Sequence, residues 1–157
     1  MMDINIVKMT KEYAQQISHW KYDGPYAFYN HSDSNIEGFM DDTHFACTHI
    51  SGELVGYFCY GNDARIPTIE ENVYDDNFLD IGLGLRPDLC GKGHGLAFFL
   101  KGIDYAQLRY NTKNLRLAVA TFNERAIKLY SRAGFYVERE VTNLRFNNKF
   151  VIMKYEG

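Results

Sequence analysis

The chain has 157 residues, of which 46% are hydrophobic and 24% are charged, and its formal net charge is −3. This size and composition are typical of a single globular domain, which we expect to span residues 1–157. The scattered lysines and arginines argue against a nucleic-acid partner, and no apolar run is long enough to suggest a membrane partner.

The N-terminal half is expected to begin with a strand and a helix and to continue into a hairpin. Thr10 is a good N-cap, so the helix should start there. Ser51-Gly52-Glu53 separates two apolar runs, which is typical of a β-hairpin. The expected order is a strand over 3–9, a helix from Thr10 to about Trp20, an irregular aromatic stretch over 20–33, a short helix over 36–40, and strands over 43–50 and 54–61.

The C-terminal half alternates strands with helices and ends in a second hairpin. Gly134 stands where a left-handed residue would end a helix, and Asn147-Asn148 suits a turn. The expected order is a polar loop over 62–77, a strand over 78–85, a helix over 96–110, a strand over 115–120, a helix over 123–133, and strands over 135–141 and 150–155. This order predicts an α/β fold, a mixed sheet with helices on both faces.

The cysteines indicate a reducing compartment. There are three, Cys47, Cys59 and Cys90, an odd number without the spacing of a metal site. The first residues carry charges where a secretion signal would be apolar, so we expect a cytoplasmic protein.

The segment LRPDLCGKGHGL, residues 85–96, has three glycines at alternate positions between an expected strand and an expected helix. A helix N-terminus carries unpaired N–H groups and a partial positive charge. Glycines leave these groups open to phosphate oxygens. The segment therefore predicts an anion site, with main-chain donors from Gly91, Lys92, Gly93, His94, Gly95 and Leu96.

Two other phosphate motifs do not fit this segment. A P-loop would need glycine at Arg86 and Ser or Thr at Gly93. A dinucleotide fingerprint counted from Gly91 would need glycine at Leu96 and a place near the first strand. A glycine-rich loop that binds no ligand remains the alternative on these residues alone.

Two motifs resemble those of the GNAT acetyltransferase superfamily. Its motif A is R/Q-x-x-G-x-G/A with a proline three residues before the R/Q. Pro87, Gly93 and Gly95 match it, although Cys90 stands where arginine or glutamine is usual. Its motif B, N-x-x-A-x-x-x-Y-x-x-x-G-F, is matched by Asn123, Ala126, Tyr130, Gly134 and Phe135. The resemblance covers residues 78–155 well, and the segment WKYDGPYAFYN is similar to one in bacterial GNAT proteins.

The resemblance implies an N-acetyltransferase that moves an acetyl group from acetyl-coenzyme A to a primary amine of a small molecule or peptide, by direct attack on the thioester. It implies a mostly antiparallel central sheet with one splayed parallel pair. The glycine loop would hold the pyrophosphate, and the backbone of Leu83 and Leu85 would pair with the pantetheine arm. Tyr130 would protonate the leaving thiolate, with a core aromatic on the helix face as the alternative. Asn123 would either bind the pantetheine or cap its helix.

The sequence leaves two questions about the strand over 78–85 open. Asp80 is a candidate base and acceptor contact, or a solvated carboxylate at a strand end. Gly82 and Gly84 would open space for cofactor and acceptor, which we favour, or allow tight packing.

The acceptor is expected to contact the N-terminal third. Trp20 and Tyr26 belong to an aromatic group that would form either an acceptor wall against a cation or a hydrophobic lid. Acidic residues also gather in two loops: Asp33, Glu37, Asp41, Asp42, Glu70, Glu71, Asp75 and Asp76. We expect most of them to be solvated loop residues and some of them to attract a cationic amine. GNAT proteins often dimerise, and the last hairpin is a candidate contact for a homodimer.

Two other classes of function compete with the enzyme. A non-catalytic module that senses coenzyme A would keep the glycine cradle without needing Tyr130. A structural protein would use the glycines for packing alone.

Overall fold

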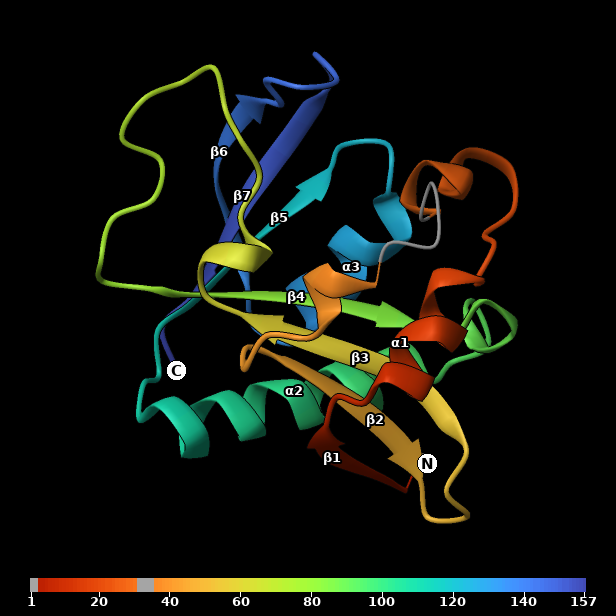
Figure 1. The fold of residues 1–157 in the computed structure, drawn as a ribbon. Coiled ribbons are helices and arrows are strands. Elements are labelled where there is room, and N and C mark those ends of the chain that lie inside the picture. Colours follow the sequence, from red (N-terminus) through yellow and green to blue (C-terminus); the bar gives the residue numbers. More distant parts are fainter. Residues whose placement is uncertain (1–2, 31–35) are drawn as a thin grey trace. The chain divides into compact units, whose positions relative to one another are not determined.

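The computed structural model describes residues 3–30 and 36–157, and its elements follow the expected order (Figure 1). The strands are β1 Ile4–Lys8, β2 His44–His49, β3 Leu54–Tyr60, β4 Leu79–Leu85, β5 Leu115–Ala120, β6 Tyr136–Thr142 and β7 Lys149–Tyr155. The α-helices are α1 Lys11–Ser18, α2 Gly95–Tyr110 and α3 Glu124–Arg132. Short 3₁₀ turns cover Gly24–Tyr29, Glu37–Phe39, Asn62–Ala64 and Pro87–Leu89.

The strands form a mixed sheet in the order β1-β2-β3-β4-β5-β7-β6. β4 and β5 are parallel, with Leu79 opposite Leu115 and Asp80 opposite Arg116. The pairs β1–β2, β2–β3, β5–β7 and β6–β7 are antiparallel. The prediction of a mostly antiparallel sheet with one parallel pair is confirmed, and the splaying of that pair stays a prediction.

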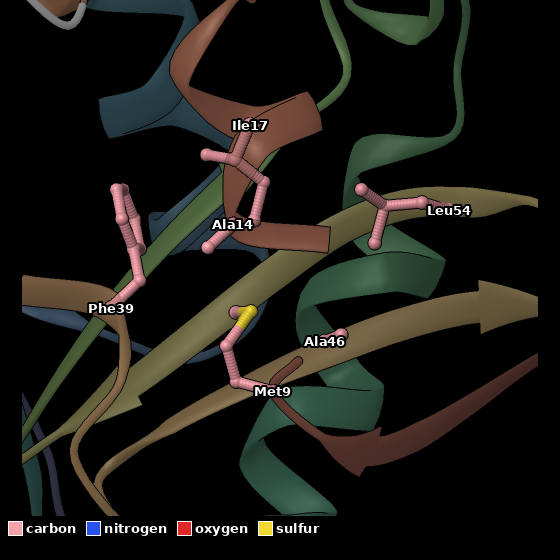
Figure 2. Packing of buried hydrophobic residues seen from close by; sticks show 6 residues of the cluster. All are labelled: Met9, Ala14, Ile17, Phe39, Ala46 and Leu54. Carbon is pink, nitrogen blue, oxygen red and sulfur yellow. The ribbon is translucent and has the colours of Figure 1, made fainter. Parts of the chain in front are cut away.

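The chain divides into two compact units, each of which has its own core. The first unit comprises Met1–Cys59 and Leu83–Lys101. Thr10 caps α1 as expected, because its side chain accepts a hydrogen bond from the N–H of Tyr13 at 3.2 Å. The apolar face of α1 then packs on the β2–β3 hairpin, and Figure 2 shows this cluster of Met9, Ala14, Ile17, Phe39, Ala46 and Leu54.

Helices cover both faces of this hairpin within the first unit. Tyr57 of β3 packs against the α1 cluster. Its neighbour Phe58 points to the other face, as successive strand residues do, and stacks on Phe98 of α2 with ring centroids 4.6 Å apart. The prediction of helices on both faces therefore holds for this part of the sheet.

The second unit comprises Tyr60–Gly82 and Gly102–Gly157. Its core includes Val73, Ala120, Val141, Phe150 and Ile152. α3 ends as expected before Gly134, which has a φ of 109°. None of the helices in the described ranges is long and apolar enough to cross a membrane.

Candidate functional site

The glycine segment forms a turn between β4 and α2 whose backbone needs glycine at two positions. Gly91 and Gly93 have φ values of 71° and 85°, in the left-handed region that other residues rarely adopt. A Cβ atom added at Gly93 would meet no atom within 4 Å, so open space lies beside this residue. Gly95 is the first residue of α2.

The start of α2 offers backbone donors next to this space. The N–H of Phe98 donates to the carbonyl of His94 at 3.1 Å, which makes His94 the N-cap. The N–H groups of Gly95, Leu96 and Ala97 therefore have no acceptor inside the helix. Because the helix dipole also favours negative charge here, the turn fits a pyrophosphate, with the exposed Lys92 adding positive charge at its rim.

The side chain of Arg86, just before this turn, is held by protein groups. It donates to Glu53 at 2.6 Å, to the carbonyl of Leu54 at 2.8 Å and to Asp88 at 2.6 Å. The hydrogen bond with Asp88 raises the pKa of Arg86, so the arginine stays charged within this pair. Arg86 thus fastens the end of β4 to the β2–β3 hairpin.

The space beside Gly84 in β4, which we expected to be empty, is filled. A Cβ atom there would collide with the ring of Tyr57. The expectation that Gly84 leaves room for a ligand is therefore wrong, because a tyrosine ring from the neighbouring strand occupies the position. Leu83 and Leu85, whose backbone was expected to pair with pantetheine, are half-buried.

Tyr22 belongs to the aromatic group that was expected near the acceptor, but the sequence did not indicate its contact with this strand. Its hydroxyl donates to the carbonyl of Leu85 at 2.9 Å. The thiol of Cys90 also points at this carbonyl, with 3.6 Å between sulfur and oxygen. Burial and the neighbouring Cys90 raise the pKa of Tyr22, so its hydroxyl stays protonated. No local pattern indicates this contact, since the two residues are 63 positions apart.

Asp80 lies in the second unit and is locked in a buried ion pair. It is 1% exposed, so the expectation of a solvated carboxylate is wrong. Arg116, itself 0% exposed, binds both carboxylate oxygens, with Nε–Oδ1 and Nη2–Oδ2 distances of 2.7 and 2.8 Å. Arg65 donates to Oδ2 at 2.8 Å. This geometry gives Asp80 a structural role and does not support its use as a base or an acceptor contact.

Arg116 is a residue that the sequence did not single out. Its guanidinium lies 4.9 Å from the centroid of the Tyr74 ring, and that of Arg65 lies 5.1 Å from the same centroid. Arg116 is also the Cα partner of Asp80 in the parallel pairing of β4 with β5. The ion pair therefore joins the two parallel strands at the point where their backbones pair.

The residues of the second motif lie on or beside α3. The Asn123 side chain accepts from the N–H of Ala126 at 3.1 Å, so it caps the helix. Tyr130 is half-buried, 6.5 Å from Phe135 between ring centroids. Tyr130 is therefore not a fully buried core aromatic. Its role as proton donor to a coenzyme held by the glycine turn stays a prediction.

The expected acceptor residues lie in the first unit. Trp20 is half-buried and tilted against Tyr57, with centroids 6.4 Å apart. Tyr26 is half-buried in the turn Gly24–Tyr29, and Phe28 in the same turn is 38% exposed. Of the acidic residues, Asp33 lies outside the described ranges. Glu70 is engaged within the second unit, where it accepts from the N–H of Thr142 at 2.7 Å.

Comparison with known proteins places this geometry in one family. A chimera of spermidine N-acetyltransferase SpeG from Vibrio cholerae with hSSAT is similar, at a TM-score of 0.76 and 16% identity over 98% of this chain and 95% of that chain. A GNAT-family acetyltransferase from Bacillus anthracis has a TM-score of 0.71 and 12% identity over 99% and 95%. A search of curated protein sequences found no match. The model of the acetyltransferase (GNAT) family matches residues 9–135, and the chain therefore belongs to this family.

Proposed function

We propose that the protein transfers an acetyl group from acetyl-coenzyme A to a primary amine of a small molecule or peptide. The observation that carries the proposal is the turn at Gly91 and Gly93, which leaves open space beside Gly93 at the N-terminus of α2. Membership of an acetyltransferase family supports the reaction type.

The glycine turn and the start of α2 would hold the coenzyme. Backbone N–H groups from Gly91 to Leu96 bind the pyrophosphate, and Lys92 adds charge at the rim. Acetyl-coenzyme A supplies the acetyl group as an activated thioester. The N–H groups of Leu83 and Leu85 orient the arm along β4 and stabilise negative charge on the carbonyl oxygen under attack.

Tyr130 is the proposed proton donor to the departing sulfur. The amine attacks in its uncharged form, and the proton that its nitrogen releases on forming the amide passes through solvent and restores the tyrosine. A tyrosine has an ordinary pKa of ~10 and a thiol one of ~8.5, so the transfer is slightly uphill but feasible within a hydrogen bond. Its half-buried position supports this role over that of a packing residue. Asp80 takes no part in the proposed mechanism, because Arg116 and Arg65 already bind both of its carboxylate oxygens inside the protein.

The acceptor is proposed to be a cationic amine. The aromatic turn at Gly24–Tyr29 presents Tyr26 and Phe28, whose ring faces attract ammonium groups. The similar Vibrio cholerae protein is a spermidine N-acetyltransferase by name, which supports a polyamine as the first amine to test.

Two measurements test the proposed function. Calorimetry with acetyl-coenzyme A should show binding, and absence of binding would contradict the anion site. Release of the free thiol should then be followed with spermidine, an aminoglycoside and a peptide with a free N-terminus, each against a reaction without amine. Binding without amine-dependent thiol release would instead favour a coenzyme A-sensing module.

A further inference from the structure

The carbonyl of Leu85 points to the edge of β4 that faces away from β3. The next N–H, that of Arg86, donates to Val55 of β3 at 2.8 Å. Because the peptide is planar and trans, its C=O points opposite to its N–H. The hydroxyl of Tyr22 occupies the hydrogen-bonding position at this outward edge, 2.9 Å from the Leu85 oxygen.

A second contact ties the same stretch of chain to β4. Trp20 lies against Tyr57, and the ring of Tyr57 fills the place where Gly84 lacks a side chain. Trp20 thus packs on the Tyr57 ring that covers Gly84, and the Tyr22 hydroxyl bonds the next residue of β4, Leu85. The strand continues from there through Arg86 into the glycine turn.

Tyr22 also closes the aromatic turn into a loop. Its backbone N–H donates to the side-chain oxygen of Asn30 at 2.6 Å. Between these two residues the chain forms the 3₁₀ turn Gly24–Tyr29, and Phe28 is 38% exposed there. One residue therefore both closes the loop and fastens it to the strand.

We propose that Tyr22 is a positioning residue that fastens the loop over 22–30 to β4 and thereby sets where the acceptor amine lies relative to the acetyl donor. This inference rests on the proposed function, in which β4 and the glycine turn hold the donor. The hydroxyl matters more than the ring, because the hydroxyl alone joins the loop to the Leu85 carbonyl. Without it, that half-buried carbonyl loses its hydroxyl donor and keeps the weaker thiol donor of Cys90, and the loop loses this link to β4.

The test uses Tyr22→Phe, which keeps the ring and removes the hydroxyl. Trp20 is the only tryptophan in the chain, so quenching of its fluorescence by acrylamide reports on the loop without any ligand. We expect stronger quenching in the variant. With the best amine of the panel we expect the amine KM to rise about tenfold, with kcat and the Kd of acetyl-coenzyme A close to wild type.

The matched control is Tyr136→Phe. Tyr136 is an exposed residue of β6, and its hydroxyl donates to Glu156. It should change neither quenching nor KM. Unchanged quenching in Tyr22→Phe, or an unchanged amine KM, would overturn the proposal. If the wild-type protein released no thiol with any amine, the proposed function would fail, and with it the positioning of the acceptor. The quenching would then still decide whether Tyr22 fastens the loop.

Discussion

The glycine turn and the Asp80 cluster use polar groups in opposite ways. At the turn, backbone N–H groups stand beside open space because Gly93 has no side chain. At the cluster, both carboxylate oxygens of Asp80 accept hydrogen bonds from Arg116 or Arg65, and Asp80 and Arg116 are almost fully buried. A carboxylate is therefore not reactive merely because it lies near a motif. A polar group can bind a ligand only if other protein groups do not already occupy it, and here the backbone N–H groups of the turn meet this condition.

The largest expected effect would come from breaking the cluster. Asp80→Ala leaves Arg116 buried without its carboxylate, so we expect the free energy of unfolding to fall by about 3–5 kcal/mol. Urea denaturation measures this loss. Glu138→Gln, which weakens a more exposed pair with Lys154, should cost less than about 1 kcal/mol. An Asp80→Ala protein of normal stability but without activity would restore Asp80 as a catalytic candidate.

The next effect concerns the hydroxyl of Tyr130, the proposed proton donor. Tyr130→Phe should lower kcat about 100-fold, because the departing thiolate loses its proton donor. The Kd of acetyl-coenzyme A should stay nearly unchanged in calorimetry. Wild-type turnover in this variant would remove Tyr130 from the acid role.

A matched pair of glycines sharpens the account of the turn. Gly93 and Gly52 both have positive φ values, 85° and 94°, and an added Cβ atom would meet nothing within 4 Å at either. Alanine at either position should therefore cost about 1–2 kcal/mol of stability through backbone strain. Only Gly93→Ala should also weaken acetyl-coenzyme A binding, by about tenfold or more, since its methyl group enters the anion site. Equal affinities of the two variants for acetyl-coenzyme A would contradict the proposal that the glycine turn binds the pyrophosphate.

The smallest effect concerns Glu70, a carboxylate less enclosed than Asp80. The hydrogen bond from the N–H of Thr142 holds the pKa of Glu70 below its usual range. A lowered folded-state pKa means that the stabilisation is present above the unfolded pKa of ~4.3 and is lost as the pH falls through the folded value. Glu70→Gln should lower Tm slightly at pH 7, and its difference from wild type should shrink as the pH falls below about 4. Glu71→Gln is the control, and a difference that is the same at every pH would contradict the linkage.

The order of strands and helices was predictable because it depends on local signals. Thr10 and Asn123 cap the helices that follow them, and the residues before and after Ser51-Gly52-Glu53 pair as a hairpin. The glycine spacing likewise predicted a loop between a strand and a helix. The structure adds that Gly91 and Gly93 are left-handed, a backbone that only glycine adopts at low cost. Asn123 could not be resolved between capping and ligand binding, since both roles use the same side chain.

The sequence by itself determined the family, the order of the elements and the glycine turn, since each follows from residues close together in the chain. Only the tertiary structure decided which groups are already in contact with other residues. Arg116 reaches Asp80 across 36 positions, Tyr57 fills the place beside Gly84, and Tyr22 finds the Leu85 carbonyl across 63 positions. Burial and hydrogen-bond partners depend on segments distant in sequence, and no local pattern records whether such a partner will be present.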